Sequence, residues 1–429
     1  MSALIVRPSK LSGVITAPPS KSYTHRAFMI ALLADGESVI KNPLIGYDTM
    51  ATIEAVKEMG AEVIQEGNTW RVRGTGGNIK PRKRFIDARN SGTTIRMMSA
   101  IAALSPQPTK LTGDQSILQR PMGPLIETLA ELGAKAKCEG KDGRPPVIVA
   151  GELEGGDVEI TGSISSQFIS AILLAAPYAR GDVNLTITGE LRSKPYVEIT
   201  LELLEMAGAK ITHDGKFKAF KIPGRQVLKP INLTIPGDFS SAAFPLGAAA
   251  ITGSTVKVNN LDIKGAQGDK RIVPLLKEFG AEVRVFKDAV EVSGEGGLNG
   301  IEADCGDNPD LVPVLAVIGS VADGETRLTN IPHLRFKETD RLRALATELR
   351  KLGVETTELP DELKIEGAKY LQGSTLRSYD DHRMAMAFTV AGLVARGKTI
   401  VENVDNIPVS YPSFIDDMRK LGAKIELIK

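Results

Sequence analysis

The chain has 429 residues, of which 42% are apolar and 24% are charged, the usage of an ordinary globular protein. Lys plus Arg total 53 and Asp plus Glu total 52, so the net charge of +1 excludes a global field that would attract nucleic acid or a membrane. A local basic cleft remains compatible with that balance.

Only two cysteines occur, Cys138 and Cys305, far apart and in no CxxC pair. This excludes a disulfide framework and argues against a structural zinc site, so no metal and no cofactor is expected. The N-terminal apolar run is too short for a signal peptide, and no apolar run approaches the length of a membrane span. We expect a cytosolic chain.

A helix-like stretch that ends in Gly and leads into a short strand recurs along the chain. The first copy, Met-Gly-Ala-Glu-Val, occupies 59–63, and the last, Leu-Gly-Ala-Lys-Ile, occupies 421–425. Glycine suits the left-handed position that ends a helix. The near-constant interval, about 72 residues, predicts six structural repeats. The glycines are Gly60, Gly133, Gly208, Gly280, Gly353 and Gly422.

In phase with these glycines, an apolar helix-like segment passes through a turn into another short strand. Each repeat is therefore expected to hold an apolar buried helix, a strand, an amphipathic helix and further strands, which predicts an α/β protein. Val197, Leu201 and Leu204 illustrate the stripe of the amphipathic helix. The expected strands cover 38–42, 109–113, 183–189, 255–259, 326–330 and 399–403.

One repeat alone cannot bury both of its helices, so neighbouring repeats should share a core. Three repeats make about 210 residues, a usual domain size. The segment 229–236 carries two prolines and is the expected linker. We therefore expect two domains.

Polar residues precede each apolar helix, and they differ from repeat to repeat. N-capping explains their Ser, Thr, Asn and Asp content. It does not explain Lys21, Arg26, Arg96 and Arg383, because cations oppose the dipole at a helix start. An anion bound there would explain them. If the two domains face each other, these helix starts would surround a cleft. The polar segments that precede the six apolar helices are 19–26, 90–96, 163–167, 238–241, 307–310 and 379–383.

Further charged residues lie close to two other helix starts. Arg120 precedes an amphipathic helix, and Lys337, Glu338 and Arg341 surround another helix start. Glu338 and Asp340 fit the ordinary role of acids that complement the helix dipole. Many cations with two or three carboxylates, and without a thiol or metal cluster, indicate acid/base chemistry on a polyanionic small molecule.

Two other patterns are interpreted as structural. The segment 392–399 matches GxxxxGK[ST], but a helix precedes it and a strand follows it, the reverse of a P-loop. The basic run 80–84 has no interleaved aromatic residues and is expected to be a solvated loop, not a nucleic-acid patch.

Seven motifs, in order along nearly the whole chain, resemble those of the 5-enolpyruvylshikimate-3-phosphate synthase family. They are Pro-Ser-Lys-Ser at 19–22 with Arg26, Asn-x-Gly-Thr-x-x-Arg at 90–96, Arg-Pro at 120–121, Ser-Ser-Gln-Phe at 165–168, Ser-Lys-Pro-Tyr at 193–196, Lys-Glu-x-Asp-Arg at 337–341 and Asp-His-Arg-Met-Ala-Met at 381–386.

This resemblance implies a fold of two domains, each of three βαβαββ repeats in an inverse α/β-barrel-like arrangement, with a ligand cleft between them. The N-terminal strand then belongs to the second domain. The implied domains are 16–232 and 1–15 plus 233–429, and a monomer is expected.

The implied reaction transfers the enolpyruvyl group of phosphoenolpyruvate to the 5-hydroxyl of shikimate 3-phosphate and releases phosphate through a tetrahedral intermediate. Asp310 matches the carboxylate that accepts the hydroxyl proton, and Glu338 with Lys21 matches the pair that moves protons at the methylene carbon. The implied ligands of shikimate 3-phosphate are Lys21, Ser22, Arg26, Ser165, Ser166, Gln167, Ser193, Asp310 and Lys337. Those of phosphoenolpyruvate are Lys21, Gly92, Arg120, Gln167, Arg341 and Arg383.

Three positions depart from the better-known bacterial pattern of this family. Val409 stands where some members carry a Lys that binds phosphoenolpyruvate, and His333 stands where some have an Asn near the shikimate. Met97 follows Arg96 where Pro is common. Gly92 matches members that glyphosate inhibits, which implies sensitivity.

Two alternatives remain open. The related UDP-N-acetylglucosamine enolpyruvyl transferases share the six-repeat fold but typically use a Cys on a mobile loop, whereas Cys138 is expected in a strand. A non-enzymatic scaffold of repeated α/β units would not require different cations at successive helix starts.

Overall fold

The described residues, 2–429, of this computed structural model form six four-stranded sheets, one for each expected repeat. One repeat runs β6 (Phe85–Asp87), α3 (Gly92–Ala102), β7 (Thr109–Thr112), α4 (Gly123–Glu131), β8 (Lys135–Cys138) and β9 (Val147–Ala150). Strand β6 pairs in parallel with β7, while β7–β9 and β8–β9 are antiparallel. This is the βαβαββ unit, and the expected mixed α/β class is confirmed.

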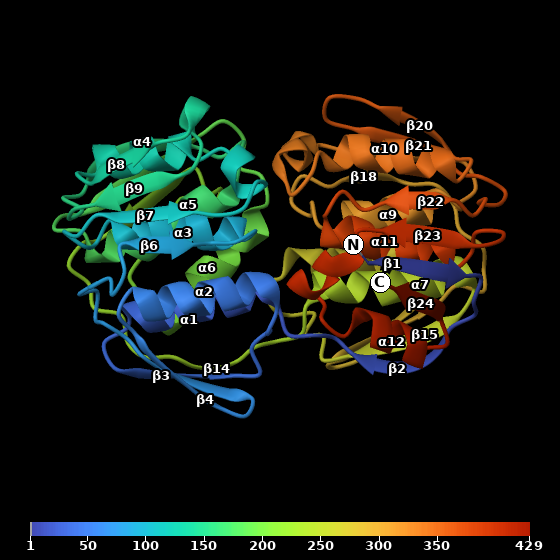
Figure 1. The fold of residues 1–429 in the computed structure, drawn as a ribbon, viewed down its shortest axis with the longest axis horizontal. Helices are drawn as coiled ribbons and strands as arrows, with labels where there is room; N and C mark the ends of the chain where they lie inside the picture. The colour runs from blue at the N-terminus through green and yellow to red at the C-terminus, as the bar shows by residue number, and fades with distance from the viewer. Residues whose placement is uncertain (1) are drawn as a thin grey trace. The chain divides into compact units, whose positions relative to one another are not determined.

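The chain divides into two units, which we call the contiguous unit, Pro19–Ile235, and the split unit, Met1–Pro18 with Pro236–Lys429 (Figure 1). Besides the repeat above, the contiguous unit contains α1 (Lys21–Leu33), β3 (Glu37–Lys41), α2 (Tyr47–Glu58), β4 (Glu62–Glu66), β5 (Thr69–Arg73), β10 (Gly156–Thr161), α5 (Ser166–Ala175), β11 (Val183–Thr188), α6 (Lys194–Met206), β12 (Thr212–His213), β13 (Ala219–Ile222) and β14 (Asn232–Thr234).

The segment expected as a linker is partly a strand. Strand β14 pairs in parallel with β3, with Asn232 opposite Val39, and so supplies the leading strand of the first repeat. The expectation of a plain linker at 229–236 was therefore wrong for 232–234. Three residues are too few for a sequence pattern to reveal a strand whose partner lies almost 200 residues away.

The N-terminal strands complete sheets of the split unit: β1 pairs with β23 and β24, and β2 pairs in parallel with β15. The elements of this unit are β1 (Ala3–Arg7), β2 (Ser12–Thr16), α7 (Phe239–Thr252), β15 (Thr255–Asn259), α8 (Ile272–Glu278), β16 (Glu282–Val285), β17 (Ala289–Ser293), β18 (Glu302–Asp304), α9 (Val312–Gly319), β19 (Glu325–Thr329), α10 (Arg341–Lys351), β20 (Glu355–Glu358), β21 (Leu363–Glu366), β22 (Thr375–Arg377), α11 (His382–Gly392), β23 (Thr399–Glu402), α12 (Phe414–Lys420) and β24 (Lys424–Ile428).

The periodic glycines end helices as predicted. All six have a positive φ, between 83° and 114°, and each lies two residues after the last helical residue. Because an L side chain is strained at such φ values, glycine is the residue that ends a helix and redirects the chain at little cost. The six predicted strands are also present, with ends that differ by no more than one residue.

The apolar helices form the interior of each unit. In the contiguous unit α3 packs on α5 and contacts α1, and in the split unit α7, α9 and α11 pack on one another. Helix α9 is buried along its whole length. In the amphipathic helix α6, Val197 and Leu204 are buried as predicted, but Leu201 is only half-buried and Leu203 is buried instead.

The two motif-like segments have the local structure that was expected. In the GxxxxGK[ST] match, Gly392 is the last residue of α11 and Thr399 begins β23, so helix precedes strand. The basic run 80–84 lies outside the helices and strands, and Lys83 forms an exposed ion pair with Glu58. Within residues 2–429, no helix is long and apolar enough to cross a membrane.

Candidate active site

Polar side chains cap most of the buried helices. Among the described residues, five of the six buried helices have a side-chain cap, whereas α9 begins after Leu311 without one. A Ser or Asp at this position accepts a hydrogen bond from a backbone N–H that would otherwise lack a partner. The capping interpretation is therefore correct for five helices, and it leaves the cations beside the caps to be explained. The caps are Ser20, Ser91, Ser165, Asp238 and Asp381.

The start of α1 places two of the predicted cations in the contiguous unit. Lys21 is the first helical residue, and its Nζ lies 3.1 Å from Oδ2 of Asp48 in the first turn of α2. Both side chains are nearly buried, with 13% and 7% exposed. Sequence reasoning missed Asp48, because an acid in a first helical turn also fits simple dipole complementation.

Arg26 lies one turn deeper in α1 and is almost fully buried. Its guanidinium donates to Thr200 Oγ1 (2.7 Å), to the Tyr196 carbonyl (2.9 Å) and to the Ser22 carbonyl (3.1 Å). Burial lowers the pKa of Arg26 to about 10, partly offset by the tyrosines Tyr196 and Tyr23. Arg26 therefore links α1 to α6, and it stays charged at neutral pH.

The start of α3 brings together five residues that were singled out from the sequence. A Cβ placed on Gly92 would lie 2.6 Å from Nη1 of Arg120 and 3.8 Å from Oε1 of Gln167. Arg96 Nη1 donates to Gln167 Oε1 (2.8 Å) and to Ser165 Oγ (3.1 Å). The buried helix starts of two repeats thus form one cationic group.

Hydrogen bonds hold the orientation of this group. Gln167 Nε2 donates to Thr93 Oγ1 (2.9 Å), so its amide bridges the starts of α3 and α5. Arg120 Nη2 donates to Asn90 Oδ1 and to Ser116 Oγ, both at 3.1 Å. The Arg120 side chain is only 8% exposed. A buried planar guanidinium fixed in this way is suited to bidentate binding of a phosphate or carboxylate.

Two predicted serines occupy special positions at helix starts. Ser166 is buried and is the first residue of α5. Ser193 precedes α6 with a φ of 58°, in the left-handed region, and is also buried. A non-glycine residue in that region costs about 1 kcal/mol or more, and such strain is concentrated at functional sites.

The split unit brings together Asp310, Glu338, Arg341 and Arg383. Arg341 Nη1 lies 2.9 Å from Oδ1 of Asp310, and its Nη2 lies 2.9 Å from Oε2 of Glu338. Arg383 Nη2 contacts the other Asp310 oxygen at 3.0 Å. Both carboxylate oxygens of Asp310 therefore pair with a guanidinium.

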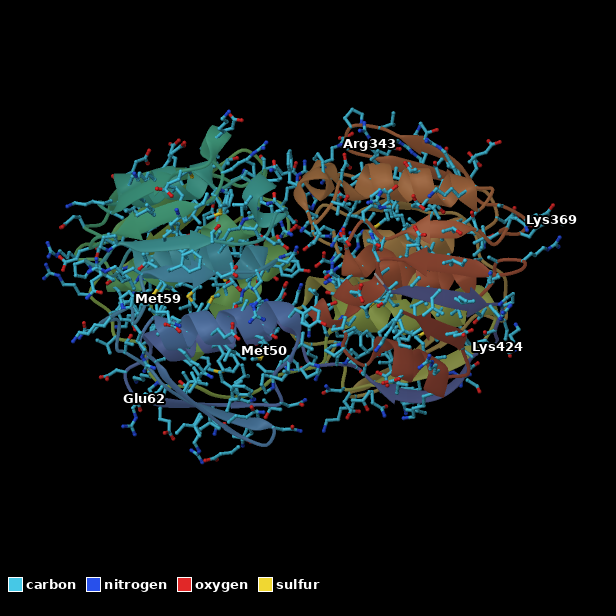
Figure 2. The ribbon with its side chains drawn as sticks, in the orientation of Figure 1. Met50, Met59, Glu62, Arg343, Lys369 and Lys424 are labelled. Carbon is cyan, nitrogen blue, oxygen red and sulfur yellow. The ribbon has the colours of Figure 1, made fainter. Side chains whose placement is uncertain are left out.

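Asp381 organises this group, although sequence reasoning did not assign it to the site. It caps α11 through the backbone N–H of Arg383 (2.9 Å) and binds Arg341 Nε (2.7 Å) and Nη2 (3.3 Å). Burial alone would lower the pKa of Arg341, but Asp381, Glu338 and Asp310 outweigh burial and raise it. Arg341 is 1% exposed, whereas Arg343, two residues later, is at the surface (Figure 2).

A second buried carboxyl, Asp269, was also missed. It accepts hydrogen bonds from Ser240 Oγ and from Asn308 Nδ2 (3.3 Å). Burial, together with the charge of Asp310, raises the pKa of Asp269 to about 6, and Ser240, Arg383 and Asn308 oppose that rise. It belongs to a short 3-10 helix, Gly268–Arg271, which carries no sequence pattern that would identify it.

Three further positions singled out from the sequence lie in or next to short 3-10 helices of the split unit. Lys337 is half-buried just after the 3-10 helix Pro332–Phe336. His333, within that helix, is buried. Val409 is 5% exposed at the end of the 3-10 helix Val404–Val409, so its apolar side chain is packed.

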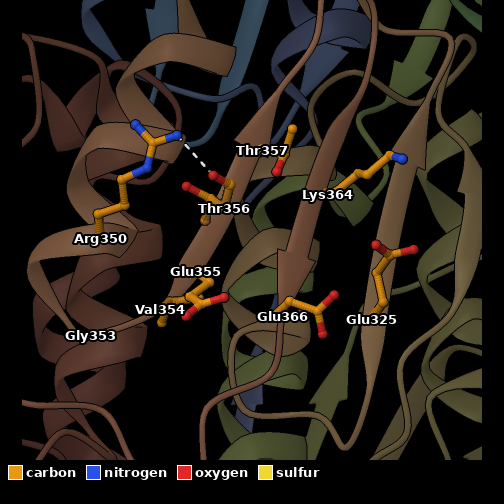
Figure 3. A pocket seen from close by; sticks show the side chains of 9 residues that line it. All are labelled: Glu325, Arg350, Gly353, Val354, Glu355, Thr356, Thr357, Lys364 and Glu366. Atoms are coloured by element: carbon orange, nitrogen blue, oxygen red, sulfur yellow. Dashed lines mark hydrogen bonds between the residues drawn. The ribbon is translucent and has the colours of Figure 1, made fainter.

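A cavity of about 640 Å³ on the split unit is formed by other residues (Figure 3). Glu325, Glu366 and Glu355 form one row across β19, β21 and β20, with Arg350 and Lys364 also lining the cavity. These side chains are exposed or half-buried, so this is a solvated sheet face. Among residues 2–429, no group of three or more His, Cys, Asp or Glu side chains could hold a metal ion.

Comparisons with known proteins agree with this architecture. The family model described as EPSP synthase (3-phosphoshikimate 1-carboxyvinyltransferase) matches residues 5–418. The 3-phosphoshikimate 1-carboxyvinyltransferase of Methanocella arvoryzae is 47% identical over 427 residues, 99% of this chain and 100% of the relative. That of Methanocaldococcus jannaschii is 44% identical over 428 residues, 99% of each chain.

Solved structures give the same result. The structure of the EPSP synthase from Acinetobacter baumannii superposes with a TM-score of 0.84 at 28% identity, covering 100% of both chains. The matches extend over the six repeats and over every motif described above. The chain therefore belongs to the EPSP synthase (3-phosphoshikimate 1-carboxyvinyltransferase) family.

Proposed function

We propose that the helix starts described above bind the two anionic substrates of this family's reaction and move its protons. The chain is a 3-phosphoshikimate 1-carboxyvinyltransferase, a transferase of the shikimate pathway and of aromatic amino acid biosynthesis. It transfers the enolpyruvyl group of phosphoenolpyruvate to the 5-hydroxyl of shikimate 3-phosphate and releases phosphate. The observation that most supports the site is the buried Arg120 guanidinium held against Gly92.

Phosphoenolpyruvate is the substrate assigned to the cations around that glycine. Because Gly92 has no side chain, an anion can approach both the N–H groups at the start of α3 and the Arg120 fork. Arg341 and Arg383 of the split unit also carry guanidinium groups that can bind a phosphate or a carboxylate. The proposed ligands are Lys21, Gly92, Arg120, Gln167, Arg341 and Arg383.

Shikimate 3-phosphate is assigned to the hydroxyl and amide groups at the starts of α1, α5 and α6. Hydroxyls at helix starts, together with basic side chains, suit a phosphate and a sugar-like ring that carries several hydroxyls. Arg26 contributes its charge from a buried position. The proposed ligands are Lys21, Ser22, Arg26, Ser165, Ser166, Gln167, Ser193, Asp310 and Lys337.

Asp310 is the proposed base for the 5-hydroxyl. Its two oxygens pair with Arg341 and Arg383. An anionic substrate that takes over either arginine frees one Asp310 oxygen to accept a proton. Substrate binding thus activates the base, because the base loses a cation that stabilised its charge.

Glu338 and Lys21 are proposed to exchange the proton at the methylene carbon of phosphoenolpyruvate. Addition of the hydroxyl oxygen to C2 places a solvent-derived proton on C3, and loss of phosphate removes a proton from C3. Deuterium from D2O should therefore enter the methylene group. Glu338→Gln should slow this incorporation at least about tenfold, since general acid/base groups contribute factors of 10² or more.

The control for that experiment is Asp340→Asn. Asp340 caps α10 and pairs with Arg335, so it supports the same helix without a proposed role in proton transfer. Incorporation by Asp340→Asn should match the unaltered chain. Incorporation at the unaltered rate in Glu338→Gln would remove Glu338 from the proposed role.

Cys138 provides an argument against the UDP-N-acetylglucosamine alternative. It lies in β8, as expected from the sequence. Burial, and then the charge of Glu127, raises the pKa of its thiol to about 11. A thiol of that kind is a poor nucleophile near neutral pH.

The domain assignment, the oligomeric state and the cellular location are also part of the proposal. We assign the contiguous and split units to the two three-repeat domains, with β14 included in the first. A monomer in the cytosol is the proposed working form. Sedimentation velocity at micromolar concentration should give the mass of one chain, and a stable dimer would contradict this.

A further inference from the structure

A chain of buried hydrogen bonds runs between three helices of the contiguous unit. His25 Nδ1 on α1 lies 2.7 Å from Thr52 Oγ1 on α2, which lies 2.7 Å from Thr94 Oγ1 on α3. Thr94 Oγ1 lies 2.7 Å from Ser91 Oγ. All four side chains belong to residues that are at most 1% exposed.

The direction of each bond follows from counting protons. Thr94 Oγ1 donates to Ser91 Oγ. A hydroxyl has one proton, so Thr94 must accept from Thr52, and Thr52 must in turn accept from His25. His25 therefore has its proton on Nδ1.

The surroundings of His25 Nε2 support the same placement of the proton on Nδ1. His25 Nε2 is buried and has no hydrogen-bond partner within the described part of the chain. A second proton placed there would be buried without an acceptor, which is costly. Burial, and then the charges of Lys21 and Arg26, hold the pKa of His25 well below 6.5. The imidazole is neutral, with a bare Nε2.

The chain ends at the helix start that the proposed function uses most. Ser91 Oγ accepts from the Thr94 backbone N–H (3.2 Å) and so caps α3. Gly92, next in sequence, faces Arg120 closely enough that a single added carbon would displace the guanidinium. A small rotation of Ser91 would therefore move the Gly92 backbone relative to Arg120, the two groups assigned to phosphoenolpyruvate.

We propose that His25 is a positioning residue for phosphoenolpyruvate: its Nδ1–H starts a hydrogen-bond chain through Thr52 and Thr94 that fixes the Ser91 cap and the Gly92 backbone. The inference rests on the proposed assignment of Gly92 and Arg120 to this substrate. His25 touches no reacting atom. It acts through α3 and connects that helix to α1, which carries Lys21.

Kinetics of matched variants test the proposal. His25→Phe keeps an aromatic ring but removes the donor, and should raise the KM for phosphoenolpyruvate about tenfold while changing the KM for shikimate 3-phosphate less than twofold. His25→Asn places an amide N–H near the position of Nδ1 and should restore most of the affinity. Thr52→Val, which interrupts the chain at its middle, should behave like His25→Phe.

Ser99→Ala is the control for general weakening of the helix. Ser99 is a buried hydroxyl on the same helix, bonded to the Ile95 carbonyl (2.7 Å) and outside the chain. Its loss should lower the melting temperature but leave both KM values unchanged. Equal KM effects in Ser99→Ala and His25→Phe would overturn the positioning role.

The tautomer provides a test that does not depend on a variant folding. Nitrogen-15 NMR of the unaltered protein should show His25 with a protonated Nδ1 and an unprotonated Nε2 between pH 6 and 8. An Nε2–H tautomer or an imidazolium would overturn the proposal. If His25→Phe is active and its KM for phosphoenolpyruvate is unchanged, the positioning role alone is overturned. If the unaltered protein is inactive with shikimate 3-phosphate, the proposed function itself is overturned.

Discussion

At the scale of single residues, the absence of a side chain at Gly92 determines how closely the Arg120 guanidinium lies against the start of α3. A Cβ there would lie 2.6 Å from Nη1, closer than real Cβ contacts allow. The guanidinium is held by Asn90 and Ser116, so it cannot move without losing hydrogen bonds. The same space is the basis for the expected sensitivity to glyphosate, an anion of similar size.

Gly92→Ala should raise the KM for phosphoenolpyruvate at least about tenfold, because displacing the Arg120 fork costs about one charge-assisted hydrogen bond. Gly123→Ala is the matched control. Gly123 also begins a helix of this unit, but a Cβ there would lie 3.5 Å from its nearest neighbour, an ordinary contact. Steady-state kinetics with each substrate varied in turn will distinguish the two. An unchanged KM in Gly92→Ala would contradict the assignment.

Asp310→Asn should lower kcat at least about 100-fold, because a positioned general base contributes factors of 10² to 10⁴. Asp307→Asn, a change in the same loop before α9, should leave kcat within about threefold. Circular dichroism would establish that both variants are folded. Near-normal turnover in Asp310→Asn would exclude it as the base.

Several cations of the candidate site could be singled out from the sequence, whereas the carboxylates that contact them could not. Lys21, Arg96 and Arg383 were recognisable because cations at helix starts oppose the dipole. Asp48 contacts Lys21 and Asp381 contacts Arg341, although 27 and 40 residues separate the partners in sequence. Asp269 lies near Arg383 and Asp310 but belongs to an earlier repeat. An acid at a helix start looks the same whether it caps a helix or holds an arginine, so only the three-dimensional contacts identify its second role.

At the scale of elements, one buried ion pair joins α10 to α11. Asp381, at the start of α11, is fully buried and holds Arg341, the first residue of α10, through two of its nitrogens. The two helices belong to successive repeats. These two repeats therefore meet at helix starts, where the candidate site residues Arg341 and Arg383 also lie.

Asp381→Asn should destabilise the split unit by about 3–5 kcal/mol, because it leaves a buried guanidinium without its main partner. For a unit of this size that corresponds to a melting temperature lower by roughly 10 °C. Asp380→Asn is the control, since Asp380 is exposed and its φ of 57° suits Asn. Calorimetry should show the decrease in the first variant only. Equal melting temperatures would show that the pair contributes little.

Elements were predictable where the pattern is periodic. Glycine at a helix end and an apolar segment before a strand identified the repeats and the six strands. Strand β14 was missed because three residues carry no period and its partner, β3, lies at the other end of the unit. The buried face of α6 is rotated toward Leu203, so Leu201 is only half-buried. The spacing of apolar residues alone does not determine this rotation.

At the scale of the whole molecule, stability should depend on the neutral state of His25. The unfolded chain binds a proton at this residue near pH 6.5, whereas burial and the neighbouring cations Lys21 and Arg26 keep the folded chain from doing so. The neutral His25 therefore leaves the free energy of unfolding at its full value above about pH 6.5. As the pH falls below that value, the free energy of unfolding decreases by at most about 1.4 kcal/mol per pH unit.

The melting temperature should accordingly decrease between pH 7 and pH 5, and His25→Asn should show a smaller decrease. The control is His213→Asn, because His213 is exposed in the short strand β12. Scanning calorimetry across that range measures the three proteins. The same pH dependence in all three would show that His25 does not carry this linkage.

The central claim is that this two-unit molecule joins phosphoenolpyruvate to shikimate 3-phosphate, and phosphate release tests it most directly. Purified protein would be assayed with phosphoenolpyruvate and with either shikimate 3-phosphate or UDP-N-acetylglucosamine as the acceptor. We predict stoichiometric phosphate release with shikimate 3-phosphate and none with the sugar nucleotide. No release with shikimate 3-phosphate, or release only with UDP-N-acetylglucosamine, would contradict the account.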